Sequence, residues 1–421
     1  TDATTLDPIQ DVGGLIPAKT VEDRIAGYIQ AKVEFGNFDA TGGVRWERTF
    51  RSGTTLSAPS ITLDLPGFQR EPRATFLDFG LVNFVDNSGS QTTWTPSILV
   101  NYRPIDNLVA RFGYFRSTVN PDIRLIRRTN TIGIDLRENP PFGDPSVTIS
   151  EANPDLKPST TDNFDFDVAY YFDDSPGLLR AGFFYKKISN NFTNVFFQGT
   201  PTDGIRERVL SELAPLVDAR PDLFEFQPNT VFRLNRPENG EGGKIYGFEL
   251  EAIRQLNFLP GFLSDFGVLG NLTYTKGDFP TLVQSFDADG NVGQTSLDRP
   301  LADQAAWVYN LSLDYARDGF EARMIYTRQT QTVTRYAITD LNTTIPAFST
   351  LDLRMSYNFD RLGGNWTVFL EGDDLLRGKR KADIRSAIAP TPGRGDANFF
   401  FPTALQFNGG RTVTMGIRGK F

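Results

Sequence analysis

The stretch of sequence from Asn153 to Asn190 decides the fold, and it reads NPDLKPSTTDNFDFDVAYYFDDSPGLLRAGFFYKKISN. Between Phe164 and Phe172, apolar residues alternate with Asp165, Asp167, Ala169 and Tyr171, a period of two that predicts a β-strand with one apolar face. The run from Asp173 to Gly177 has the composition of a turn, and the alternation resumes at Leu179. The run Asn153–Pro158 before the first strand is rigid and polar, because its two prolines disfavour helix. The stretch therefore predicts a hairpin of two two-faced strands.

The same pattern recurs along the whole chain. We expect about thirteen strands, at 24–35, 42–50, 94–102, 108–117, 164–172, 179–186, 244–255, 266–276, 304–316, 320–332, 350–359, 366–371 and 411–421. Two further short β segments are expected near 61–65 and 75–84. Apolar residues at helical spacing predict one short loop helix within 205–216. Turns of a few residues alternate with connections of some tens of residues.

This alternation of short and long connections favours a transmembrane antiparallel β-barrel, with short periplasmic turns and long extracellular loops. The strand lengths agree, since a tilted strand needs about 9–11 residues to cross the hydrocarbon. In the strand at 350–359, Asp352 and Arg354 lie on the face opposite Leu351 and Leu353. A water-filled barrel accommodates these charges, whereas a closed core would impose a large desolvation cost. A large soluble β protein or a solenoid is the alternative.

Composition excludes several classes of function. The net charge of -8 argues against nucleic acid as a partner, because phosphate binding needs a basic surface. The chain has no Cys and no His, which excludes disulfides, thiol nucleophiles, His-based triads, His zinc sites and histidyl haem ligation. No run of 18 apolar residues is present, so we expect no transmembrane helix. We expect neither an enzyme nor a cofactor.

Several short motifs carry a resemblance to a known family. The run Asn153–Pro158 resembles the Asn-Pro-x-Leu-Lys-Pro-Glu signature of TonB-dependent outer-membrane receptors, with Ser159 in place of the Glu. Gly43–Glu47 resembles the family's Gly-x-Arg strand, and Gly247–Glu251 resembles its Gly-x-Glu strand. Further matches are the segment 369–375, with acid where the family has Asn, and the terminal strand 411–421. Each motif is weak alone, but their order and spacing over 21–421 make the resemblance strong. The chain looks like the large-loop type common in oligotrophic proteobacteria.

The resemblance implies a location and an architecture. It places the chain in the outer membrane of a Gram-negative bacterium, as the C-terminal portion of a barrel that has 22 strands in this family. Residues 1–20 then remain from an extracellular loop, and 21–421 form part of the barrel wall. We expect the plug domain and about nine further strands to come from a second chain or an N-terminal part, through which TonB acts. The other partners implied are outer-membrane lipid and the barrel-assembly machinery, which receives the terminal Phe421.

The candidate binding residues lie in the expected loops. They are Phe192, Phe196 and Phe197, then Phe399, Phe400 and Phe401, and the basic cluster Arg124, Arg127 and Arg128. Aromatic rings suit sugars or hydrophobic chelates, and arginines suit an anionic ligand or lipopolysaccharide. Packing between loops and a salt-bridge network are the alternative readings. Asp287, Asp289, Asn291 and Asp298 faintly resemble a calcium loop, but Val292 stands where such a loop needs Gly, so an ordinary turn is favoured.

The function expected is uptake of a scarce ligand that is too large for porins and binds at the external loops. Oligosaccharide uptake fits the aromatic and acidic loops, whereas a ferric siderophore fits the arginines. A structural barrel subunit that anchors a surface assembly, or a passive porin, is the alternative.

Overall fold

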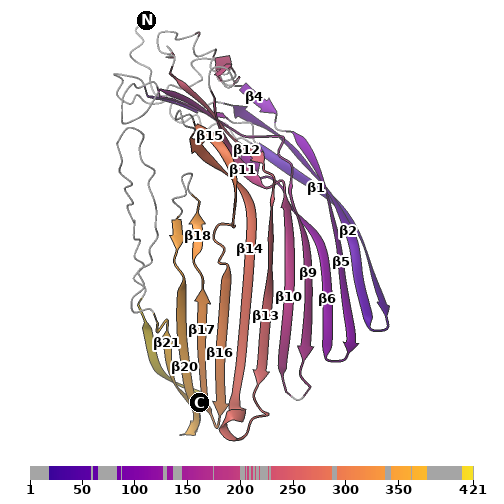
Figure 1. Cartoon of the computed structure of the whole chain (residues 1–421), viewed down its shortest axis with the longest axis vertical. Coiled ribbons are helices and arrows are strands. Elements are labelled where there is room, and N and C mark those ends of the chain that lie inside the picture. Colours follow the sequence, from indigo (N-terminus) through magenta and orange to yellow (C-terminus); the bar gives the residue numbers. More distant parts are fainter. Residues whose placement is uncertain are drawn as a thin grey trace.

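The computed structural model describes residues 19–57, 60–64, 83–86, 88–126, 130–135, 145–173, 175–199, 204, 206–207, 210–211, 214, 218, 226, 229–286, 292–336, 343–361, 363–376 and 410–420. Thirteen strands form one continuous antiparallel path, which we call the wall (Figure 1). In their order across the sheet they are β1 (Lys19–Phe35), β2 (Phe38–Ser57), β5 (Gly89–Ile105), β6 (Leu108–Val119), β9 (Ser159–Tyr171), β10 (Gly177–Ser189), β13 (Gly243–Gln255), β14 (Phe266–Phe286), β16 (Trp307–Arg317), β17 (Phe320–Gln329), β20 (Phe348–Arg361), β21 (Gly364–Asp373) and β22 (Thr412–Lys420). The predicted antiparallel wall is confirmed.

Strand register separates the wall into two chemically different faces. Phe183 of β10 lies opposite Phe166 of β9 and Phe248 of β13. Because directly opposed residues share a face, these rings belong to one surface, which we call the apolar face. The neighbouring residues Asp167 and Glu249 flank Gly182 on the other surface, the polar face. The alternation of the sequence is therefore kept in register from strand to strand.

Short turns close the hairpins at one end of the wall, which we call the turn end. Gly36, between β1 and β2, has φ of 54°. Between β16 and β17, Asp318 and Gly319 have φ of 48° and 82°, as two-residue hairpin turns require. The connection from β13 to β14 contains a 3₁₀ helix, η3 (Gly261–Asp265). The opposite end, which carries the long connections, is the loop end.

A second sheet stands at the loop end (Figure 1). Its strands, in spatial order, are β11 (Phe192–Gly199), β12 (Val231–Asn239), β8 (Ser146–Glu151), β7 (Asn130–Asp135) and β3 (Ser60–Asp64). They come from three different long connections, and the β12–β8 and β3–β7 pairs are parallel. The long connections read from sequence as loops thus contain an organised sheet, and only the segment near 61–65 was expected as β.

Two of the three largest fully buried side chains among the described residues belong to this second sheet. Val147 and Ile149 of β8 are completely buried, and Phe232 and Leu234 of β12 are nearly so. A short helix, α1 (Ile123–Ile126), adds the buried Ile126. The helix expected within 205–216 lies mostly outside the described residues, although Arg206 and Glu207 are helical. The remaining described strands are β4 (Asn83–Asp86), β15 (Val292–Arg299), β18 (Thr332–Arg335) and β19 (Thr343–Ile345).

The wall has two edge strands. Among the described residues, β1 pairs only with β2, and β22 pairs only with β21. Large apolar side chains remain exposed on both strands, including Ile29 and Val33 on β1 and Met415 and Ile417 on β22. Exposed apolar side chains next to unpaired backbone groups invite a further partner.

Candidate functional site

Ion pairs line the polar face of the wall. Arg111 of β6 contacts Asp167 at 2.9 Å, and Arg180 of β10 contacts the same carboxylate at 3.4 Å. Farther along the sheet, Arg323 pairs with Asp314 across β16 and β17. Each pair joins neighbouring strands, so the charges form cross-strand bridges. The polar face is therefore a charged surface suited to contact with water or polar partners.

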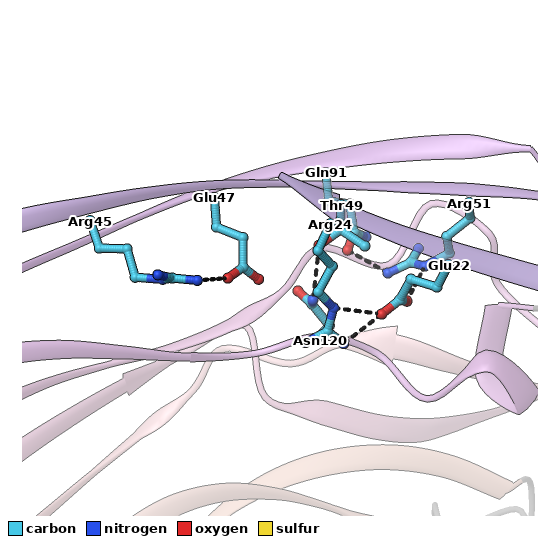
Figure 2. Close-up of polar contacts among 8 residues, drawn as sticks. All are labelled: Glu22, Arg24, Arg45, Glu47, Thr49, Arg51, Gln91 and Asn120. Carbon is cyan, nitrogen blue, oxygen red and sulfur yellow. Dashed lines mark hydrogen bonds and ion pairs between the residues drawn. The ribbon is translucent and has the colours of Figure 1, made fainter. Parts of the chain in front are cut away.

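A polar cluster lies at the loop end of β1, β2 and β5 (Figure 2). Arg51 and Glu22 are directly opposed in the β1–β2 pair. Arg51 Nε donates to Glu22 Oε2 at 3.3 Å, and its Nη2 donates to Gln91 Oε1 at 2.7 Å. Arg24 Nε donates to Glu22 Oε1 at 2.8 Å. Because the Arg51 side chain is only 5% exposed, its charge depends on these partners.

Glu22 and Glu47 are better shielded than Arg24 and Arg45, whereas Arg51 is more deeply buried than either carboxylate. Arg24 is 56% exposed and Glu22 18%. Arg45 donates to Glu47 at 2.8 Å, and these side chains are 49% and 21% exposed. Figure 2 shows the Arg45–Glu47 pair on the left and the contacts of Glu22 with Arg24 and Arg51 on the right. The cluster thus offers guanidinium forks, which match carboxylate and phosphate oxygens in geometry.

The ionisation of Glu22 gives this cluster a pH dependence. Burial alone would raise the pKa of Glu22, but hydrogen bonds from Arg24 and Arg51 outweigh it and hold the pKa below its usual value. Because the pKa of Glu22 is lower in the folded state, its ionised carboxylate stabilises the fold at pH values above the unfolded-state pKa, about 4.3. This stabilisation is lost as the pH falls through the folded-state pKa.

We therefore expect acidification from neutral pH to destabilise the loop end of the β1–β2 pair, and Glu22→Gln to remove this pH-dependent part. Amide hydrogen exchange of β1 and β2, measured across the acidic range, checks this. If the exchange rates of the wild type and of Glu22→Gln change with pH in the same way, Glu22 is not the source of the pH dependence.

The cluster is connected to the sequence signature Asn153–Pro158. Gln91 Nε2 donates to the carbonyl oxygen of Leu156 at 2.6 Å, and the Leu156 side chain is only 1% exposed. Asn153 Nδ2 donates to the carbonyl of Pro237 in β12 at 3.0 Å. The signature therefore lies between the wall and the second sheet and is bonded to both.

A second asparagine completes this junction. The Lys157 N–H donates to Asn239 Oδ1 at 2.8 Å, and Asn239 Nδ2 donates back to the Lys157 carbonyl at 2.9 Å. Asn239 Nδ2 also donates to the carbonyl of Asn190, at the end of β10. One side chain at the end of β12 thus joins the signature to the wall.

The sequence-predicted site residues are only partly described. Arg124 is the second residue of α1 and pairs with Asp122 at 3.1 Å, while both side chains stay exposed. Phe192 begins β11 and is half-buried. Asp298 is exposed in β15. The other candidates lie outside the described residues or side chains: Arg127, Arg128, Phe196, Phe197, Asp287, Asp289, Asn291, Phe399, Phe400, Phe401 and Phe421.

The Arg124–Asp122 pair favours the local salt-bridge reading for that arginine. Within the described part of the chain, no group of three acidic side chains is placed to hold a metal ion. No described helix is long and apolar enough to cross a membrane.

Sequence reasoning missed the Arg51 cluster, although a signal was present. The expected strand ends at Phe50, whereas β2 continues to Ser57. The polar alternation Arg45, Glu47, Thr49, Arg51 runs straight through the expected end. Continuing the period of two by one step would have placed Arg51 on the polar face.

Comparisons with known proteins agree with this geometry. Residues 1–375 match the family model "TonB dependent receptor-like, beta-barrel". No curated protein sequence matches.

Several solved structures share the fold, and three of them are compared with the chain. The ferric-catecholate import receptor Fiu from E. coli K12 aligns with a TM-score of 0.53 and 14% identity, covering 95% of this chain and 45% of that one. A mutant of the ferric enterobactin receptor PfeA from Pseudomonas aeruginosa, in complex with enterobactin, aligns with a TM-score of 0.52 and 14% identity, covering 94% of this chain and 54% of that one. The copper transporter OprC aligns with a TM-score of 0.52 and 15% identity, covering 96% of this chain and 49% of that one. The chain thus spans about half the length of the structures that it matches.

Proposed function

Since the chain belongs to the TonB dependent receptor-like β-barrel family, we propose that it supplies wall and mouth to a receptor that takes up a scarce ligand. Members of this family are outer-membrane transporters of Gram-negative bacteria and not enzymes. The apolar face lies against lipid, and the polar face lines the interior of the barrel. The ligand enters at the loop end, where the second sheet stands.

The charged cluster at the loop end supports an anionic ligand. Arg24 and Arg45 lie on the polar face and are more exposed than Glu22 and Glu47. A ligand that reaches this surface meets guanidinium groups first, and these bind carboxylate, catecholate or phosphate oxygens in pairs. An anionic metal chelate too large for porins meets this requirement. A neutral oligosaccharide accepts hydrogen bonds from the arginines but carries no negative charge to pair with them.

The energy for uptake comes from outside the described wall. We propose that a plug domain and the remaining strands, contributed by another part of the receptor or a second chain, complete the barrel against the exposed edges of β1 and β22. TonB acts on the plug, and the present residues supply the path and ligand contacts. The sequence-based assignment of 1–20 to an extracellular loop and 21–421 to the barrel belongs to the same proposal.

The double variant Arg24→Gln, Arg45→Gln in the complete receptor tests the ligand class. We expect uptake of a ferric tris-catecholate or ferric citrate to fall about tenfold or more, because hydrogen bonds to charged groups contribute roughly 1.5–3 kcal/mol each. Uptake of iron-55 by cells depleted of other receptors measures it. Lys32→Gln is the matched control, since this exposed cation of β1 lies near the turn end.

Other outcomes separate the alternatives. Unchanged chelate uptake in the double variant would contradict an anionic ligand, and loss of neutral oligosaccharide uptake would favour the sugar instead. Uptake that persists without TonB would indicate a passive porin. A surface assembly that needs the chain but not TonB would indicate a structural subunit.

A further inference from the structure

A band of aromatic rings crosses the apolar face near the loop end. Tyr114 of β6 lies opposite Phe164 of β9, which lies opposite Tyr185 of β10. The ring centres are 4.9 Å and 6.3 Å apart. Farther along the sheet, Tyr274 and Trp307 are opposed, with their ring centres 4.6 Å apart. Such a band marks the level of the membrane–water interface.

A row of cations lies on the same face, just beyond these rings. In six strands, a Lys or Arg follows an aromatic residue by two positions toward the loop end and therefore shares its face. The pairs are Trp46 with Arg48, Tyr114 with Arg116, Tyr185 with Lys187, Tyr246 with Lys244, Tyr274 with Lys276, and Tyr326 with Arg328. We call these six cations the basic belt.

Strand register makes the central part of the belt continuous. Arg116 lies opposite Asp162, Asp162 opposite Lys187, and Lys187 opposite Lys244. Lys244 in turn lies opposite Asp278 of β14. These five side chains form a row across five neighbouring strands, so the spacing of the cations is fixed by the sheet and not by loop conformation.

The two carboxylates orient the cations without covering them. Arg116 holds Asp162 with two hydrogen bonds of 2.8 Å and 2.9 Å. Asp278 contacts Lys244 at 3.5 Å and Lys276 at 3.9 Å, and both lysines remain half exposed. Lys187 and Arg328 are also exposed. Six cations against two acids leave the belt with a positive surface.

The turn end of the apolar face is different. There, the Arg254 guanidinium lies 3.8 Å from the ring centre of Phe172 and 5.3 Å from that of Phe258. Arg317 contacts Asp265 at 3.2 Å and Asp318 at 3.3 Å. These two arginines contact aromatic rings or carboxylates of the protein itself. The exposed cations at the loop end are therefore not explained by a general need for charge at a membrane interface.

We propose that the basic belt binds the phosphate groups of lipid headgroups in the outer leaflet of the outer membrane. The aromatic band places the belt at headgroup depth, and the exposed ammonium and guanidinium groups complement phosphate in charge and geometry. The belt faces the membrane and lies on the surface opposite the Arg24–Arg45 cluster, so it does not serve the transported ligand. It fixes the depth and rotation of the wall in an anionic leaflet.

The test uses the complete receptor in nanodiscs that contain bisphosphorylated lipid A, with dephosphorylated lipid A as the matched lipid. The variant Lys187→Gln, Lys244→Gln, Lys276→Gln should retain about tenfold less bisphosphorylated lipid after detergent exchange, because each cation near an anionic surface adds to binding. Mass spectrometry of the retained lipid gives the ratio. Lys186→Gln is the matched control, since it adjoins Lys187 but lies on the polar face, opposite Asn163.

Folding of each variant is judged by the heat-dependent change of its mobility in gel electrophoresis. If the triple variant does not fold, a second variant keeps the test decisive. Asp162→Asn with Asp278→Asn leaves the cations in place without their carboxylates and should increase lipid retention. Equal retention by the triple variant and the Lys186→Gln control would overturn the proposal. Equal retention of the two lipids would do so too, and displacement by millimolar inorganic phosphate would indicate a free-phosphate site instead.

Discussion

Replacement of Leu156 by alanine is expected to loosen the whole second sheet from the wall. The side chain is 1% exposed, and loss of a fully buried leucine costs about 2–5 kcal/mol, depending on how far the cavity collapses. The loss falls on a junction: Gln91 of the wall binds the Leu156 carbonyl, and Asn153 binds β12 and, through its N–H, the carbonyl of Leu125. We expect faster amide exchange in β8 and β12, with the turn end of the wall unchanged.

The matched control for this variant is its neighbour. Lys157 is exposed, and it contacts Asn239 through its backbone only. Lys157→Ala should therefore change stability by less than about 0.5 kcal/mol. Hydrogen exchange of the second sheet compares the two variants directly. If Leu156→Ala exchanges no faster than Lys157→Ala, the signature does not hold the two sheets together.

The wall could be predicted from the sequence because one physical rule governs each of its strands. A period of two places Phe166, Phe183 and Phe248 on the same face of three neighbouring strands, and the register confirms it. Short turns carry their own signals, such as Asp318–Gly319 with positive φ. These signals are local, so the thirteen strands of the wall are recovered in order, although some ends differ widely: β14 continues to Phe286, whereas the expected strand ends at residue 276.

The second sheet could not be predicted in the same way, because its pairings are non-local. Strand β8 contains a six-residue alternation in which Val147 and Ile149 are buried. That run is too short to distinguish a strand from a loop. Its partner β12 lies some eighty residues farther along the chain and pairs in parallel. Nothing in the sequence of either segment specifies the other.

The candidate site shows the same limit. Arginines and phenylalanines in loops were identifiable as residue types, but their neighbours were not. Arg124 proves to pair with Asp122 two residues away, whereas Arg51 finds Glu22 and Gln91 on two other strands. Ser159, which stands where the family has Glu, begins β9 and donates its hydroxyl to the Ser189 carbonyl at 3.2 Å. The residue types were identifiable from the sequence, whereas the partners of their side chains were not.

Replacement of Leu250 by arginine is expected to destabilise the receptor in the membrane by about 2–4 kcal/mol, the cost of an arginine on the lipid face at the midplane of a barrel. Leu250 lies on the apolar face, opposite Ala181 and Leu272, and is 44% exposed. It stands four residues from Tyr246 of the aromatic band and four from Arg254 at the turn end, about 13 Å along the strand in each direction. An arginine there cannot reach water along the strand without bending its side chain past several residues.

The matched control places the same residue on the other face. Thr273 of β14 lies opposite Glu249 on the polar face, so an arginine at position 273 enters a polar surface with a carboxylate beside it. Thr273→Arg should therefore change stability by less than about 1 kcal/mol, as exposed ion pairs do. Denaturant unfolding of the complete receptor in lipid vesicles measures both variants. If the two arginines cost the same, the apolar face does not lie against lipid, and the outward position of the basic belt is lost with it.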